Sequence, residues 1–196
     1  MKSEQSEVDI SVVASKERIR LITEGKLPWE LCQQMMRLEE KDEDRFLKYM
    51  EVLQERVPWK EKILCRMTEK LYVVRKDDGS RIVKCICGQE YGDYRINWKL
   101  SCRIRVRRSK EEWREVMSME EVIPNPNLVE SREYYCPGCF TRQGVEVVPV
   151  GYPAIFEILP DIDLVYRMHD KPLEDESPDW FQDKTADLTS KWAKEV

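Results

Sequence analysis

The sequence predicts an α+β protein with a small N-terminal helical lobe, an antiparallel β region and an extended C-terminal arm. Two observations support this class. Apolar residues recur at helical spacing over the first sixty positions, and they alternate with polar residues, as in strands, in the middle of the chain. We expect a flexible N-terminal arm at 1–14, the helical lobe at 15–60, the β region at 61–156 and an acidic C-terminal arm at 157–196.

Three helices are predicted in the lobe. Ser15 can cap the first, over residues 16–24. Pro28 fits the first turn of the second. Asp42 opens the third, because apolar side chains then recur at i, i+3, i+4 and i+7. Those apolar positions are Phe46, Tyr49, Met50 and Leu53.

The β region begins with two alternating segments, 71–75 and 81–85. They flank an Asp78-Gly79 pair that is typical of a hairpin turn. Residues 99–107 also alternate and predict a strand, whose apolar side should face the interior. That apolar side comprises Leu100, Cys102, Ile104 and Val106. The remaining predicted elements are a helix over 110–119 and strands over 132–135 and 145–150.

Composition excludes several function classes. The 33 basic and 38 acidic residues give a net charge of −5, which does not favour nucleic acid overall. No uncharged apolar run approaches the ~20 residues of a membrane helix, and the opening residues lack the apolar core of a secretory signal. We therefore expect a cytoplasmic protein. A single histidine, His169, and the lack of a glycine-rich phosphate loop predict no catalytic and no cofactor-binding residues.

The cysteines carry the main chemical signal. Their number, seven, is odd, which favours metal binding or burial over a disulfide framework. Four of them form the pairs Cys85-Ile86-Cys87 and Cys136-Pro137-Gly138-Cys139, each in a tight turn after a predicted strand. Two such turns make a closed four-thiolate site. We predict a structural zinc site ligated by Cys85, Cys87, Cys136 and Cys139.

This site would make the β region zinc-ribbon-like, with a strand and a helix inserted between its halves. A redox dithiol is the chemical alternative for Cys136-Pro137-Gly138-Cys139. That chemistry requires the first cysteine at a helix N-terminus, whereas strand-like residues follow here. We expect the other cysteines, Cys32, Cys65 and Cys102, to be buried.

A basic segment leaves two interpretations open. Residues 95–114 contain eight basic and two acidic side chains, and such a stripe can bind nucleic acid. It can equally be a sheet face paired with acidic groups of a partner or of this chain. Residues 157–196 carry 11 acidic and 5 basic side chains, and the net negative charge favours the paired interpretation.

Five blocks of sequence resemble a known family. The sequence is similar, in the same order, to the small zinc-binding gamma subunit of acetone carboxylase over roughly residues 16–167. The blocks are Tyr49–Trp59, Cys85–Gly88, Asn97–Leu100, Arg132–Cys139 and Pro160–Ile162. The match places the family's zinc ligands on the four paired cysteines. Phe140 departs from it, because the family's second turn usually has glycine there.

The resemblance implies a complex of two larger carboxylase subunits with this small one. Such a complex uses ATP and bicarbonate, without biotin, to convert a ketone to a 3-oxo acid, as acetone to acetoacetate. The ATP and Mn²⁺ sites are implied on the larger subunits, and the small subunit holds Zn²⁺ and is not catalytic. The ketone stays open between acetone, butanone and an aromatic ketone. The alternative is a stand-alone zinc-ribbon protein that binds nucleic acid or a regulatory partner.

Overall fold

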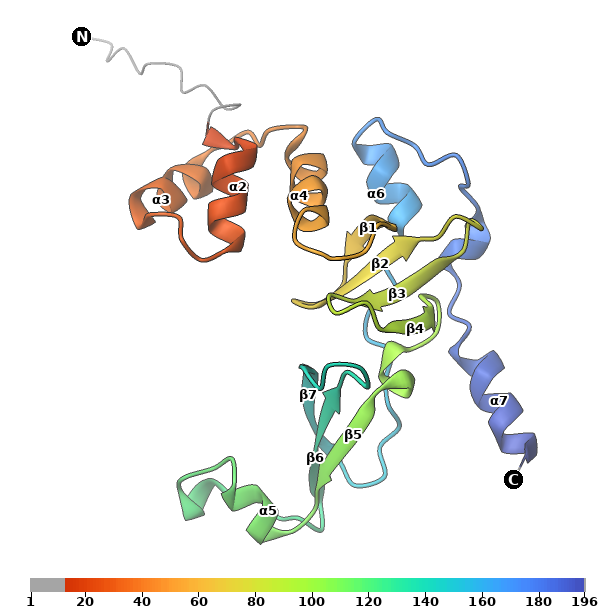
Figure 1. Ribbon diagram of the computed structural model, residues 1–196. Helices are drawn as coiled ribbons and strands as arrows, with labels where there is room; N and C mark the ends of the chain where they lie inside the picture. Colours follow the sequence, from red (N-terminus) through yellow and green to blue (C-terminus); the bar gives the residue numbers. More distant parts are fainter. Residues whose placement is uncertain (1–12, 196) are drawn as a thin grey trace.

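The computed structural model describes residues 13–195 and combines helices with antiparallel sheets, which confirms the predicted class (Figure 1). Residues 1–12, most of the expected N-terminal arm, lie outside the described part. The helices are α2 (Lys16–Thr23), α3 (Trp29–Arg37), α4 (Arg45–Gln54), α5 (Lys110–Arg114), α6 (Ile162–Met168) and α7 (Thr185–Glu195). The strands are β1 (Lys62–Arg66), β2 (Leu71–Arg75), β3 (Arg81–Cys85), β4 (Glu90–Asp93), β5 (Arg103–Arg107), β6 (Val129–Tyr135) and β7 (Arg142–Pro149). Three short 3-10 helices are η1 (Trp98–Ser101), η2 (Glu120–Val122) and η3 (Pro178–Phe181).

The helical lobe forms from the three predicted helices. Ser15 caps α2 by accepting a hydrogen bond from the Arg18 N–H. The helices enclose a small apolar cluster that includes Ile19, Met35 and Val52. Helix α4 begins at Arg45, later than expected, after a turn in which the Asp42 carboxylate accepts a hydrogen bond from the Asp44 N–H at 3.1 Å. No described helix has the length and apolar character needed to cross a membrane.

The first sheet has the strand order β1-β2-β3-β4 and is antiparallel throughout. The predicted hairpin joins β2 to β3, with Gly79 at φ +82° and the Asp78 carboxylate accepting from the Ser80 N–H at 2.9 Å. Both faces of the sheet are covered. Met50 and Leu53 of α4 pack on one face, and α6 packs on the other through apolar side chains. The apolar side chains of α6 in this packing are Ile162 and Tyr166.

The C-terminal segment, expected as an acidic arm, packs onto the first sheet through a buried arginine. Arg81 is almost fully buried in β3. Its guanidinium lies 2.6 Å from the Asp163 carboxylate of α6 and 3.2 Å from that of Asp175. A buried arginine requires such partners, because an unpaired charge in the interior is strongly destabilising. The acidic composition of this segment therefore serves pairing within the chain.

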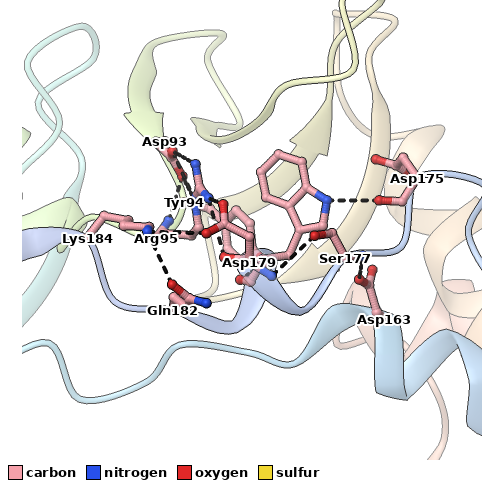
Figure 2. Close-up of polar contacts among 10 residues, drawn as sticks. Asp93, Tyr94, Arg95, Asp163, Asp175, Ser177, Asp179, Gln182 and Lys184 are labelled. Atoms are coloured by element: carbon pink, nitrogen blue, oxygen red, sulfur yellow. Dashed lines mark hydrogen bonds and ion pairs between the residues drawn. The ribbon is translucent and has the colours of Figure 1, made fainter.

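A tryptophan anchors the same segment further along. Figure 2 shows Arg95 between the carboxylates of Asp93 and Asp179. The Trp180 ring lies 4.7 Å from each of the guanidinium carbons of Arg81 and Arg95. Cations over an indole ring attract it electrostatically. Beyond this contact, α7 projects away from both sheets (Figure 1).

The second sheet has the order β5-β6-β7, also antiparallel. The strand predicted over 99–107 is wrong in its first half, where η1 forms because the Asn97 side chain accepts from the Lys99 N–H at 3.1 Å. The predicted inward side is wrong too. Ile104 is exposed, whereas Lys99 and Arg107 are buried. The helix predicted over 110–119 is confined to α5, which begins with a Ser109 capping box.

Candidate metal centre

The fold brings both cysteine pairs to one point. Cys85 and Cys87 lie at the turn after β3, and Cys136 and Cys139 lie in the turn between β6 and β7. All four Sγ atoms lie within 4.8 Å of one another. Cys85 Sγ is 3.9 Å from Cys139 Sγ, and Cys87 Sγ is 3.8 Å from Cys136 Sγ. The four residues singled out by their spacing thus form one cluster.

The cluster has the dimensions of a tetrahedral site. Four sulfurs at about 2.3 Å from a zinc ion would stand about 3.8 Å apart, close to the observed separations. A closed set of four thiolates leaves no position for water or substrate, so its chemistry is structural. The four cysteines could therefore hold a metal ion, and their donor set is that of structural zinc sites.

Two tight turns present the sulfurs. In the first, the Gly88 N–H donates to the Cys85 carbonyl at 2.8 Å, with Gly88 at φ +98°. In the second, the Phe140 N–H donates to the Cys136 carbonyl at 2.9 Å, with Phe140 at φ +58°. Phe140 thus adopts the left-handed backbone that usually favours glycine. At this position the phenylalanine therefore occupies a glycine-like conformation.

The two turns approach each other closely at Gly138. A Cβ there would lie 3.1 Å from the Gln89 side chain and 3.6 Å from Cys87 Sγ. A larger residue would push the turns apart and spread the sulfurs. The Cys136-Pro137-Gly138-Cys139 motif also links two strands instead of starting a helix, so the dipole that activates a redox dithiol is not provided.

Polar side chains that were not predicted from the sequence surround the sulfurs. Gln143 Nε2 donates to Cys85 Sγ at 3.5 Å, and Thr141 Oγ1 lies 3.2 Å from Cys139 Sγ. The hydroxyl of Tyr91 is buried without a hydrogen-bond partner among the described residues, and it lies close to the thiols of both Cys136 and Cys102. A thiolate at Cys136 would supply the acceptor that this hydroxyl lacks. These contacts fit sulfurs that carry negative charge.

The thiols differ in how readily they ionise. Burial raises the pKa of Cys85 far above its ordinary value. Burial also acts to raise the pKa of Cys139, but hydrogen bonds from Thr141 and the neighbouring thiols outweigh it and lower the pKa to about 6. Four thiolates this close repel one another, and a bound cation is what offsets that repulsion. The cluster is consistent with a site completed by a cation.

The centre joins the two sheets. Its first turn belongs to the first sheet and its second turn to the second sheet. Cys85 and Cys136 are part of one apolar cluster that also contains Trp98 and Tyr134. The Trp98 ring packs edge-on against Tyr134 at 6.0 Å. Cys85 and Cys139 are 54 residues apart in the sequence. A metal held here would therefore crosslink two distant parts of the chain.

The other candidate residues lie elsewhere. The three remaining cysteines are half-buried, and burial raises the pKa of Cys65 to about 11 and that of Cys102 to about 12. His169 is also half-buried, with its ring stacked on Phe46 at 4.9 Å beside the helical lobe.

Ion pairs within the chain account for most of the basic segment. Six of the eight basic side chains in 95–114 have acidic partners among the described residues. Two of the partners, Glu157 and Asp179, belong to the acidic C-terminal segment. The six are Arg95, Lys99, Arg105, Arg107, Arg108 and Arg114. This geometry supports the paired interpretation of the segment.

Comparisons with known proteins identify the family. Residues 57–170 match the family model described as acetone carboxylase gamma subunit. The chain is 35% identical over 154 residues to the acetone carboxylase gamma subunit of Xanthobacter autotrophicus, a match covering 78% of this chain and 90% of that protein. It is also 35% identical over 78 residues to the acetophenone carboxylase beta subunit of Aromatoleum aromaticum, covering 39% of this chain and 60% of that protein. The chain therefore belongs to the acetone carboxylase gamma subunit family.

Proposed function

We propose that this protein is the small, structural zinc-binding subunit of an ATP-dependent, biotin-independent ketone carboxylase. Family membership supports a role as a ketone carboxylase subunit, because both relatives bear the names of such subunits. The complex would convert a ketone and bicarbonate to a 3-oxo acid in the cytoplasm. Acetone, giving acetoacetate, is the substrate favoured by the longer of the two matches.

The proposed division of labour leaves the chemistry to two larger subunits. ATP and Mn²⁺ would be bound there, and this chain alone would be inactive. Bound at the four cysteines, zinc would supply a crosslink between the two sheets. Gln143 and Thr141 would hold the sulfurs in place, and the rigid turns would present the second sheet to the larger subunits.

The observation that carries the zinc assignment is the four-sulfur cluster between the sheets. The test is native mass spectrometry of the complex purified gently from its own host, with elemental analysis. We expect two larger chains with this one, and one zinc ion for each copy of this chain. Ketone-dependent ATP hydrolysis with bicarbonate fixation should follow in the intact complex.

A matched pair of variants tests the link between metal and assembly. Cys85→Ser should lose zinc and no longer assemble, whereas Cys65→Ser, which changes a thiol outside the cluster, should retain both. A Cys85→Ser chain that assembles normally without zinc would contradict the coupling. Isolation of the wild-type chain without larger partners would contradict the carboxylase role.

A further inference from the structure

Phe140 combines two features that are unusual together. Its backbone adopts φ +58°, a conformation that is sterically disfavoured for any residue with a Cβ atom. Its side chain is nevertheless 61% exposed, so apolar burial within this chain offsets little of that strain. Exposed, strained positions of this kind are characteristic of functional sites. Glycine would form the same turn without strain, so the aromatic ring itself requires an explanation.

The ring lies among cationic side chains. The Arg103 guanidinium is 5.2 Å from the centre of the Phe140 ring. Strand register places Arg103 and Arg142 in one row across the sheet, on either side of Tyr135. Arg142 also pairs with Glu133. Arg103 makes no ion pair with any residue that the structure describes.

Apolar side chains continue the same face. In the next row, Val145 stands opposite Glu133, and alternation along β7 places Val147 on the same side. Both valines are exposed. The face thus combines an aromatic ring, uncovered valines and an arginine without an acidic partner. We define the knuckle surface as Phe140, Arg103, Arg142, Val145 and Val147.

We propose that the knuckle surface is the docking site for an acidic, apolar segment of one of the larger carboxylase subunits. An apolar side chain of that segment would cover the Phe140 ring, and a carboxylate would pair with Arg103. Aromatic residues and arginine are enriched at the centres of protein interfaces, where covering the ring also strengthens nearby ion pairs. The inference rests on the proposed function, because the occupant is a subunit of that complex.

The charge pattern determines the kind of occupant. Arg103 is a planar cation that matches a carboxylate through two parallel hydrogen bonds. An acidic segment would satisfy it, whereas a basic one would be repelled. Because Phe140 belongs to the turn that carries Cys136 and Cys139, a bound metal would also hold the ring rigidly in position.

Two substitutions at Phe140 separate the ring from the strain. Full-length Phe140→Gly and Phe140→Ala chains would be titrated into the larger subunits, purified from a host strain lacking this chain. Both should bind at least ~10-fold more weakly than wild type, because both lose the ring. Only Phe140→Gly should raise the melting temperature of the free chain, by ~2–4 °C, because only glycine relieves the strain.

Controls make the test specific. Phe181→Ala removes a phenylalanine of similar exposure, 54%, on η3 and should bind as wild type does. Arg103→Glu should weaken binding more than Arg103→Lys, and the difference should shrink at high salt. If the wild-type chain binds the larger subunits and Phe140→Gly binds them with the same affinity, this inference is overturned and the proposed function still stands. Failure of the wild-type chain to bind them would overturn both.

Discussion

The two sheets bury different mixtures of side chains: mainly apolar ones in the first, with Arg81 and Lys84 of β3 as charged exceptions, and several charged ones in the second. In the first, strands β2 and β3 place Leu71, Val73 and Val83 in an interior covered by helices on both faces. In the second, the buried side chains include charged ones, while Val145 and Val147 face outward. The buried charged residues around the second sheet are Lys99, Arg107, Glu130 and Glu133.

This difference indicates different sources of stability. Apolar burial stabilises the first sheet directly, at about 25 cal/mol for each Å² removed from water. Buried ion pairs add little net stability, because desolvation opposes their attraction. We therefore expect the second sheet to depend more on a metal bound at the four cysteines, and its outward valines are consistent with a surface completed by a partner.

Loss of the metal should have the largest effect and should separate the sheets. Cys139→Ser changes an exposed sulfur of the cluster and should abolish metal binding. We expect the second sheet to lose about 5 kcal/mol or more of protection against hydrogen exchange, because metal binding contributes directly to folding. The first sheet should stay protected.

Hydrogen exchange with mass spectrometry checks this prediction. Cys32→Ser, at a cysteine of α3 outside the cluster, is the matched control and should resemble wild type. Equal loss of protection in both sheets would show that they form one cooperative unit. The two sheets would then not differ in their dependence on the metal.

Breaking a buried ion pair should have the next largest effect. Arg107 pairs with Glu133, and both side chains are buried. Arg107→Ala leaves the carboxylate without its buried partner and should lower the free energy of unfolding by about 3 kcal/mol. Arg105→Ala, two positions earlier on the same face of β5, removes a half-exposed pair with Glu115 and should cost less than about 1 kcal/mol. Urea denaturation measures both, and equal effects would contradict the buried role.

A pair of valine truncations compares the sheets with one chemical change. Val73 of β2 is 0% exposed and Val147 of β7 is 56% exposed. Val73→Ala should destabilise the free chain by about 2 kcal/mol, because it leaves a cavity in a packed interior. Val147→Ala should change the stability by less than about 0.5 kcal/mol. If urea denaturation showed that the two variants were equally destabilised, Val147 would be buried in the free chain by self-association, and the native mass of the chain would reveal this.

The sequence predicted some elements of the two sheets correctly and others not. The hairpin at Asp78-Gly79 was predictable because its signals are local. The strand predicted over 99–107 was wrong in its first half. The sequence alternates there, but the chain forms η1, which Asn97 caps at its start. Strand β1 was not predicted, since neighbouring Ile63 and Leu64 are both buried and do not alternate. Burial on both faces erases the period that identifies a strand.

Some residues of the candidate site could be predicted from the sequence and others could not. Short spacing was enough to single out the four cysteines, and the fold brings them together. Tyr91 and Gln143 could not be found, because their contacts with the sulfurs depend on how the two sheets meet. Likewise, acidic composition suggested an arm, although Asp163 and Asp175 are partners of a buried arginine far away in sequence.

The smallest expected effect is a loss of stability at low pH. It tests whether the second sheet relies on ionised carboxylates. Glu130 is fully buried, 2.5 Å from the Arg108 guanidinium and 2.6 Å from that of Arg132. The hydrogen bond from Arg108 lowers the pKa of Glu130 below its usual value, with Arg132 adding to the effect against burial. Because the folded-state pKa is lowered, the stabilisation is present above the unfolded pKa, about 4.3, and is lost as the pH falls through the folded value.

Glu130→Gln should therefore cost about 1.5 kcal/mol at neutral pH, the scale of a hydrogen bond to a charged group. The difference from wild type should begin to shrink as the pH falls below about 4.3, where the unfolded chain becomes protonated, and should disappear as the pH falls through the lower pKa of folded Glu130. Urea midpoints between pH 7 and pH 3.5, with metal content recorded at each pH, measure this. Glu120→Gln is the control, since its pair with Arg114 is exposed and should leave the curve unchanged. A constant difference across this range would mean that Glu130 acts through its shape and packing, and the second sheet would then resemble the first more closely than its buried charges indicate.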